Sequence, residues 1–83
     1  MNVEAYPNPF NDQVHVKVNL LHEGSVIIRL MNLLGEEMLR EKFDNVLEGG
    51  NQFSLEAAYL NAGIYILQVI TPGGEYSMKV EKE

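Results

Sequence analysis

The sequence predicts an all-β fold, a single immunoglobulin-like antiparallel β-sandwich of about seven short strands that spans residues 1–83. Two observations lead to this fold class. Apolar and polar side chains alternate along much of the chain, and successive side chains of a strand point to opposite faces of a sheet. Glycine, proline and asparagine also interrupt the alternation about every ten residues, which is the spacing of turns in a β-sandwich.

The clearest strand is predicted over residues 12–20, where four apolar side chains alternate with polar ones: Val14, Val16, Val18 and Leu20. A second strand is predicted over residues 25–31. It is rich in β-branched residues, which favour the pleated surface of a sheet. A short edge strand is expected over residues 2–6.

The segment after Gly35 allows two interpretations. Residues 36–43 hold good helix formers and have apolar side chains at helical spacing, but they give only about two turns. A glycine adopts the backbone of a tight turn at little cost, so a hairpin partner for residues 25–31 is the simpler reading.

Three more segments complete the predicted sandwich. A glycine turn precedes an alternating strand that holds Phe53 and Leu55, and residues 57–63 form a connection with room for one helical turn. The nearly continuous apolar run of residues 63–71 is typical of a central strand covered on both sides. The last strand follows the "PGG" turn, with Tyr76, Met78 and Val80 facing inward.

The stretch "YPNPF", residues 6–10, predicts a corner between the edge strand and the strand that follows. Each proline fixes φ near −65° and disfavours helix at the residue before it. Prolines also lack the N–H that a central strand needs. We therefore expect the chain to turn here, with Tyr6 and Phe10 plugging the end of the sandwich.

Composition excludes several classes of function. The formal net charge is −6, from 12 acidic and 6 basic residues, so binding to nucleic-acid phosphates is not expected. No apolar run approaches the roughly 20 residues of a transmembrane helix. Cysteine is absent, which removes disulfides, thiolate metal sites and thiol nucleophiles.

The residues that carry chemistry do not form a recognisable catalytic or metal site. His15 and His22 are expected on the surface and far apart, and the acids are scattered. Asn8, Asn11 and Asp12 supply calcium-type oxygen ligands, but they match no known loop motif, and Asp12 is better explained as capping a turn. The sequence thus predicts no enzyme, no cofactor and no metal.

The ordered set of "YPNPF", "NLLGEE", "LNAGIYILQV" and "MKVEKE" resembles the C-terminal sorting domain of the type IX secretion system, from Tyr6 to about Lys82. Residues that match the family's motifs are Pro7, Asn8, Pro9, Asn32, Leu33, Leu34, Gly35, Gly63, Tyr65, Lys79 and Val80. The chain departs from the pattern at Glu81, where members often continue with an apolar residue. Without the resemblance, Tyr65 is better explained as core and Lys79 as a solvated guard of a sheet edge.

The resemblance implies a domain at the end of a larger exported protein of Bacteroidetes-type bacteria. Such a domain directs its N-terminal cargo through the periplasm and across the outer membrane to the cell surface or the medium. Its implied partners are the type IX translocon and a sortase-like peptidase, which often removes the domain, with a cleavage site expected upstream of Met1. The alternative is a non-catalytic adhesive or interaction module of an extracellular protein, because sandwiches host many functions. Oligomeric state stays open.

Overall fold

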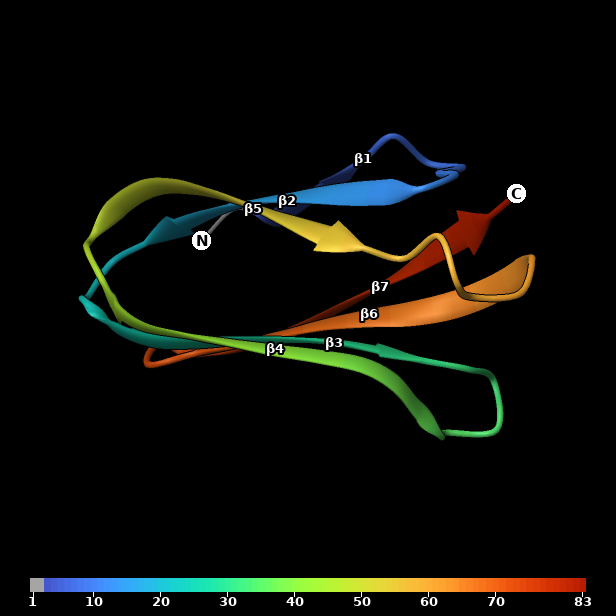
Figure 1. Ribbon diagram of the computed structural model, residues 1–83. Coiled ribbons are helices and arrows are strands. Elements are labelled where there is room, and N and C mark those ends of the chain that lie inside the picture. The colour runs from blue at the N-terminus through green and yellow to red at the C-terminus, as the bar shows by residue number, and fades with distance from the viewer. Residues whose placement is uncertain (1–2) are drawn as a thin grey trace.

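The computed structural model describes residues 3–83 and contains seven strands in two sheets. In chain order the strands are β1 (Val3–Tyr6), β2 (Gln13–Leu20), β3 (Gly24–Met31), β4 (Glu37–Val46), β5 (Gly49–Glu56), β6 (Gly63–Thr71) and β7 (Gly74–Lys82). A three-stranded sheet with the order β1-β2-β5 packs on a four-stranded sheet with the order β4-β3-β6-β7 (Figure 1). The predicted β-sandwich of about seven strands is confirmed.

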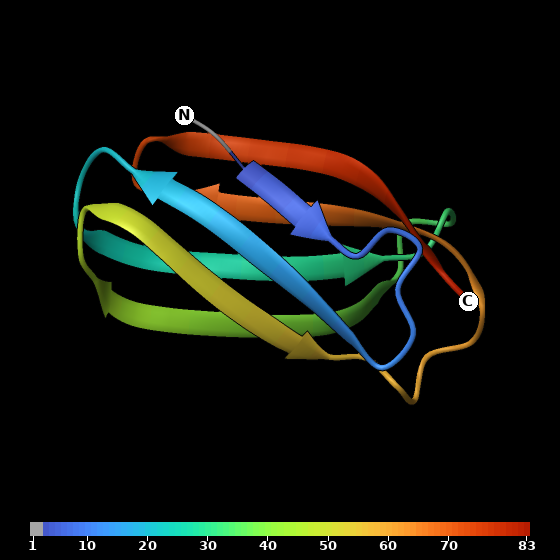
Figure 2. The same ribbon diagram turned by 90° about the horizontal axis from the view of Figure 1, so that it is seen from above.

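All pairings between the strands are antiparallel, and three of the connections cross from one sheet to the other. The pairs β1–β2, β3–β4 and β6–β7 are hairpins within a sheet. The connections β2–β3, β4–β5 and β5–β6 change sheets, and the strands of the two sheets cross obliquely (Figure 2). Crossing at an acute angle is the packing expected of two twisted sheets.

The core lies between the sheets and is built from the alternating positions that the sequence marked as inward. The strands β2 and β3 each bury every side chain on their inward face. These buried side chains are Val14, Val16, Val18 and Leu20 of β2 and Val26, Ile28 and Leu30 of β3. From β6, which lies beside β3 in the four-stranded sheet, come Tyr65, Leu67 and Val69. The rings of Phe43 and Phe53, with centroids 4.4 Å apart, close one open side between β4 and β5.

Two local expectations need correction. Tyr6 does not plug the end of the sandwich, because alternation along β1 turns it outward, where its ring lies 5.4 Å from His15. The apolar run of β6 is central within its sheet but covered on one face only. Its outward residues Ile64, Ile66 and Ile70 are half-buried by neighbouring strands rather than by another layer.

The remaining expectations on elements have simpler outcomes. Of residues 36–43, all but Glu36 belong to the hairpin partner β4 (Glu37–Val46), and none belongs to a helix. Residues 57–60 form a single turn, closed by the Leu60 N–H on the Ala57 carbonyl at 3.1 Å. The predicted edge strand is present as β1, whereas Asn2 lies outside the described residues. Within residues 3–83, no helix has the length and apolar character needed to cross a membrane.

Candidate recognition surface

The opening corner binds the last strand, and we call this arrangement the clasp (residues 8–10 with residues 79–83). The Glu81 N–H donates to the Asn8 Oδ1 at 2.9 Å, and the Asn8 Nδ2 donates to the Lys79 carbonyl at 3.4 Å. The Phe10 N–H donates to the Glu81 carbonyl at 2.9 Å, and the Glu83 N–H donates to the Phe10 carbonyl at 2.9 Å. The corner therefore covers the outer edge of β7 where that strand ends.

Proline explains why a side chain takes part in the clasp. Pro7 and Pro9 have no N–H to offer to a neighbouring strand, so the Asn8 side chain supplies a donor and an acceptor instead. Both proline peptide bonds, Tyr6–Pro7 and Asn8–Pro9, are cis. Phe10 follows and is fully buried, so it anchors the corner in the core as predicted.

Gly63 and Tyr65 open β6 at the same end of the molecule. Gly63 has a φ of 153°, a conformation that side-chain-bearing residues rarely adopt, and it lies opposite Lys82. Tyr65 is buried, and its hydroxyl donates to the Asn61 carbonyl, four residues upstream, at 2.6 Å. This is the tyrosine corner of immunoglobulin-like sandwiches, which ties the start of the strand to the connection before it. The interpretation of Tyr65 as core is confirmed.

The terminal strand presents its residues in two directions. Val80 is buried opposite Tyr65, whereas Lys79 is exposed on the outer face opposite Ile66. Lys82 is buried as well, and its Nζ donates to the Glu83 carbonyl at 3.1 Å. The sequence offered no clear signal for a buried lysine here, because its burial depends on the corner that packs alongside.

The turn between β3 and β4 is ordered by Asn32. Its Oδ1 accepts from the N–H groups of Leu34 and Glu36, each at 2.9 Å, and its main-chain carbonyl accepts from the Gly35 N–H at 3.0 Å. An asparagine that bonds its own following main chain is a recurrent way to fix a turn. Gly35 has a φ of 86°, so a glycine is favoured at this position.

All four motif segments lie at one end of the sandwich (Figure 1). The corner and the end of β7 contact each other directly, and the start of β6 pairs with that end. The Asn32–Gly35 turn lies at the same end but is held by bonds within residues 32–38. The motif segments that meet here are far apart along the chain. Asn8 and Glu81, which are joined by a hydrogen bond, are 73 residues apart in the sequence.

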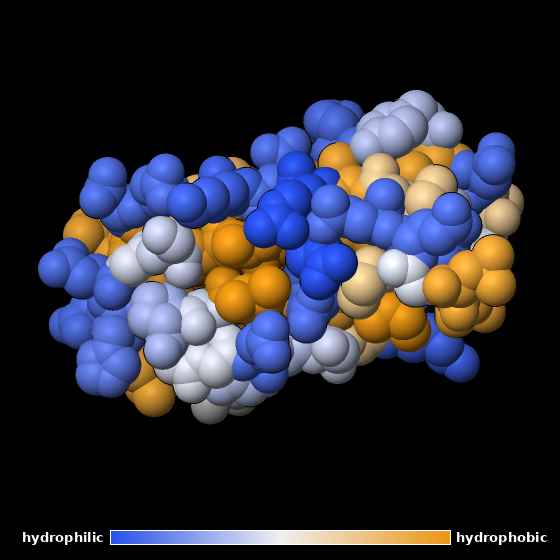
Figure 3. Space-filling view, turned by 90° about the horizontal axis from the view of Figure 1, so that it is seen from below, coloured by the Kyte–Doolittle hydropathy of each residue, from blue (hydrophilic) through white to orange (hydrophobic). Residues whose placement is uncertain are grey.

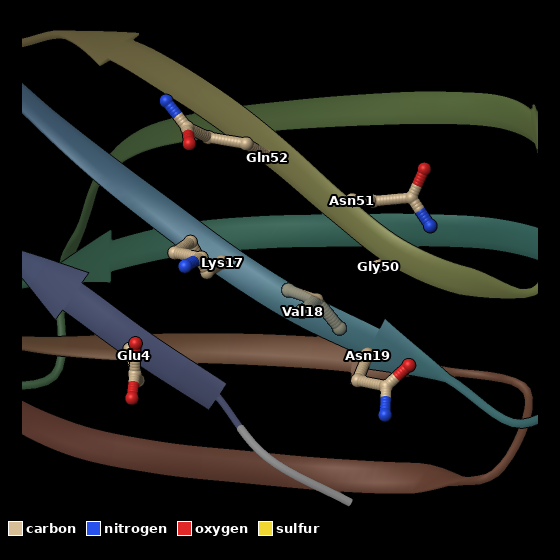
Figure 4. Close-up of a pocket in the computed structure, with 7 residues that line it drawn as sticks. All are labelled: Glu4, Lys17, Val18, Asn19, Gly50, Asn51 and Gln52. Atoms are coloured by element: carbon tan, nitrogen blue, oxygen red, sulfur yellow. The ribbon is translucent and has the colours of Figure 1, made fainter.

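A polar hollow of about 470 Å³ lies elsewhere, on the outer face of the three-stranded sheet (Figure 4). Its lining residues are Glu4, Lys17, Val18, Asn19, Gly50, Asn51 and Gln52. The polar side chains are spread over three strands and do not converge on one point (Figure 4). Asn51 is already engaged, because its Nδ2 donates to the carbonyls of Leu47 and Gly49. The arrangement is that of a solvated sheet face.

The titratable residues form no second candidate site. His15 is half-buried rather than fully exposed, with its Nδ1 2.8 Å from the Ser54 Oγ, and His22 lies exposed in the β2–β3 connection. Among residues 3–83 no three His, Cys, Asp or Glu side chains lie close enough together to hold a metal ion. The expected turn cap by Asp12 is not seen, because its side chain makes no hydrogen bond among residues 3–83; its main-chain carbonyl instead accepts from the Ala57 N–H at 2.8 Å.

One ion-pair cluster lies on the outer face of the four-stranded sheet. The Arg29 Nε donates to the Glu37 Oε1 at 2.6 Å, and an Arg40 Nη reaches the same oxygen at 3.2 Å. The Arg29 Nη1 also donates to the Gln68 Oε1 at 2.7 Å. The hydrogen bond from Arg29, with a smaller contribution from Arg40, holds the pKa of Glu37 below its ordinary value.

Comparison with known proteins gives one family. The family model described as a secretion system C-terminal sorting domain matches residues 4–83, nearly the whole chain. A search of curated proteins returns no match to the chain.

Proposed function

The chain belongs to the family of secretion system C-terminal sorting domains, and from this premise we propose that it directs a larger cargo protein through the periplasm and across the outer membrane by the type IX secretion system. Membership implies a cargo protein and export to the cell surface or the medium. The observation that carries the proposal is the family match over residues 4–83. In this proposal the cargo precedes the domain in a longer chain.

The folded end that holds the motif segments supplies the recognition surface in this proposal. A domain that is recognised by a protein complex binds best with a rigid shape, because ordering a flexible segment costs binding free energy. The clasp and the tyrosine corner provide such rigidity with hydrogen bonds of 2.6–3.4 Å. Some of the motif residues stabilise the end of the sandwich that holds the motif segments: Pro7, Asn8, Pro9, Gly63, Tyr65 and Val80. The Asn32–Gly35 turn and Lys79 act as exposed contacts.

The structure limits one mode of docking, the addition of a strand at the free edge of β7. Outward main-chain groups alternate along an edge strand, and at the end of β7 these groups belong to Lys79, Glu81 and Glu83. The clasp already occupies the Lys79 carbonyl, both main-chain groups of Glu81 and the Glu83 N–H. A translocon strand that pairs with β7 therefore meets a free edge only from Glu75 to the Lys79 N–H, unless the clasp opens.

The domain performs no reaction itself in this proposal. Its family is one of sorting signals rather than of enzymes, and the polar side chains of the hollow on the three-stranded sheet do not converge on one point (Figure 4). Removal of the domain by a sortase-like peptidase, or attachment of the cargo at the cell surface, follows translocation and is carried out by other proteins.

The test is a reporter fusion. Residues 1–83 are attached to the C-terminus of an inert fluorescent reporter that carries a signal for export to the periplasm. The fusion is produced in a host with type IX secretion and in the same host without a working translocon. The proposal predicts release or surface display in the first host and periplasmic retention in the second. Retention in both hosts, or equal release from both, contradicts it.

A truncation of residues 78–83 is the obvious second variant, and we expect it to trap the fusion in the periplasm. The truncation also removes the buried Val80 and Glu81, the residue to which Asn8 binds in the clasp. The domain therefore loses stability as well as its terminal residues. Point variants that keep the fold are needed to separate recognition from folding.

A further inference from the structure

The sandwich of residues 3–83 has four edge strands, and three of them are protected against pairing with another chain. An edge strand presents unpaired main-chain groups, and proteins protect such edges by short length, proline, charge or a covering segment. The strand β1 has four residues and is followed by Pro7. The strand β4 carries five charged side chains between Glu37 and Asp44, and the outer face of its sheet shows a band of hydrophilic side chains (Figure 3). The clasp covers the end of β7.

The fourth edge strand, β5, has none of these protections. Residues 49–55 hold neither a charged residue nor a proline. The register between β5 and β2 runs without a bulge from Gly49 to Glu56, and β2 is the only strand of residues 3–83 that pairs with β5. The strand β5 is therefore the long edge of this sandwich that is open to another strand.

The register with β2 also shows which main-chain groups of β5 point away from the sheet. The Ala57 N–H donates to the Asp12 carbonyl at 2.8 Å, and these residues lie opposite each other when the register is continued by one residue. Hydrogen-bonded and non-hydrogen-bonded pairs alternate along an antiparallel ladder. The odd-numbered residues of β5 therefore bond to β2. The outward N–H and C=O groups belong to Gly50, Gln52, Ser54 and Glu56.

Phe53 lies at the centre of this edge. It is half-buried, and its ring centroid lies 4.4 Å from that of Phe43 at the open side of the sandwich. The strand β5 crosses over β4 here, so the second sheet does not run along its edge (Figure 2). A second β5 that runs antiparallel and is centred on Phe53 brings the two Phe53 side chains opposite each other. Because Phe53 bonds to β2, the new pair is non-hydrogen-bonded, and side chains approach most closely in such pairs.

Charge selects the same register. With a two-fold axis at Phe53, Glu56 lies opposite Gly50 of the second copy, and Glu48 lies opposite Ala58. A shift of the axis by one residue toward the start of β5 places Glu48 opposite Glu56 instead, and like charges directly opposite each other destabilise a strand pair. A shift by one residue toward the end of β5 reduces the number of hydrogen-bonded residue pairs.

We propose that β5 is a self-association edge, at which two copies of the domain pair antiparallel about a two-fold axis at Phe53. The pairing joins the two three-stranded sheets into one continuous sheet with the order β1-β2-β5-β5-β2-β1. This association goes beyond the proposed function and does not depend on it. An interface between two strand edges is small, so we expect a Kd between about 10 µM and about 1 mM.

The features of β5 favour a second copy over other occupants. A lipid surface does not pair the main-chain N–H and C=O groups of a strand edge. A strand of unrelated sequence has no fixed residue opposite Glu56 or Phe53, whereas a second β5 supplies Gly50 and a matching phenylalanine. The net charge of −6 opposes self-association, and salt screens this repulsion. The dimer should therefore become tighter when the salt concentration is raised.

Sedimentation equilibrium of purified residues 1–83 tests the association. The weight-average mass should rise from the 9.4 kDa of one copy toward twice that value as the protein concentration passes through the Kd. The test variant is Ser54→Pro and the matched control is Ser77→Pro, because both serines are exposed on edge strands and their N–H groups point away from the sheet. Proline is tolerated at such positions, since no hydrogen bond of the sheet is lost.

The two proline variants should differ in association. We expect Ser54→Pro to raise the Kd about tenfold or more, because it removes a donor from each copy, and Ser77→Pro to leave the Kd within about twofold of wild type. Ser54→Ala controls for the contact between the Ser54 hydroxyl and His15, and it should also stay within about twofold. Urea midpoints verify that each variant is folded.

Two NMR measurements on the wild-type domain do not depend on any variant. Amide exchange at Gln52 and Ser54 should slow at least about fivefold when the dimer forms, since their N–H groups become bonded, whereas Phe53 and Leu55 should change little. In a mixture of ¹³C-labelled and unlabelled protein, an intermolecular contact is expected between the Hα of Asn51 and the Hα of Leu55. These residues lie opposite each other in a non-hydrogen-bonded pair of the proposed register.

Several outcomes would overturn the proposal. A monomer at every concentration up to about 1 mM does so, because that concentration exceeds the expected Kd. A dimer that survives in Ser54→Pro, or that is lost only in Ser77→Pro, assigns the association to another edge. A dimer in which β7 is exchanged between the copies shows intermolecular contacts of β7 with β6 and none at β5, and it also contradicts the proposal. Export of the reporter fusion decides the proposed function separately and leaves these results unchanged.

Discussion

Substitution of Asn8 by alanine tests the clasp most specifically. The change removes an acceptor for the Glu81 N–H at 2.9 Å and a donor to the Lys79 carbonyl at 3.4 Å, and it leaves the two prolines in place. A typical hydrogen bond contributes about 0.5–1.5 kcal/mol net, and the longer bond belongs at the low end. The free energy of unfolding should therefore fall by about 1–2 kcal/mol, which for a domain of this size lowers Tm by about 5–10 °C.

The assay combines thermal unfolding with amide hydrogen exchange. Exchange at the Glu81 amide should speed up at least about tenfold in Asn8→Ala, since its acceptor, the Asn8 Oδ1, has gone. The neighbouring Val80 amide should keep its protection, because Val80 lies opposite Tyr65 within the sheet.

Asn11→Ala is the matched control, since the Asn11 side chain is exposed and makes no hydrogen bond to residues 3–83. It should leave Tm within about 2 °C of wild type. Equal Tm for Asn8→Ala and Asn11→Ala, with unchanged exchange at Glu81, would refute the reasoning that the corner holds the last strand.

Three further substitutions test the packing and the charges of the domain. Tyr65→Phe leaves the Asn61 carbonyl without its partner and should lower the free energy of unfolding by about 1–2 kcal/mol in urea titration; an unchanged midpoint would contradict the role assigned to the hydroxyl. Phe10→Ala should cost about 3–5 kcal/mol, a large share of the total for 83 residues, and the purified variant should unfold at markedly lower urea. The bond from Arg29 lowers the pKa of Glu37 from 4.5, so its stabilisation is present above that pH and is lost as the pH falls through the lowered pKa. The Tm difference between wild type and Glu37→Gln should accordingly shrink from pH 6 to pH 3, and a difference that is constant with pH would argue against this ion pair.

Much of the fold follows from the sequence because the period of two is a local property. Val14, Val16 and Val18 face the core wherever β2 pairs, since a shift by one residue would bury Lys17 instead. The same holds for the inward residues of β3 and β7. Alternation fixes which face is buried, but it leaves open which strand lies beside which.

The features that the sequence did not predict depend on such long-range pairing. The clasp joins Asn8 to Glu81, which is 73 residues away in the sequence, and no local sequence pattern predicts this contact. The outward turn of Tyr6 follows from its pairing with His15, and the open outer face beside Ile66 follows from a two-layer architecture. The exposure of Leu34 did have a local signal, because two leucines between Asn32 and Gly35 stand in a segment with turn chemistry.

The most direct test of the account is a hydrogen-exchange footprint of the domain bound to isolated type IX translocon. The central claim is that the end of the sandwich that gathers the motif segments is the surface that the export machinery contacts. We expect slower exchange on binding in residues 32–36 and in the outer-facing residues around them, with no change in the connections at residues 21–23 and 47–48. Protection confined to those opposite connections, or to the outer face of the three-stranded sheet, would contradict the account.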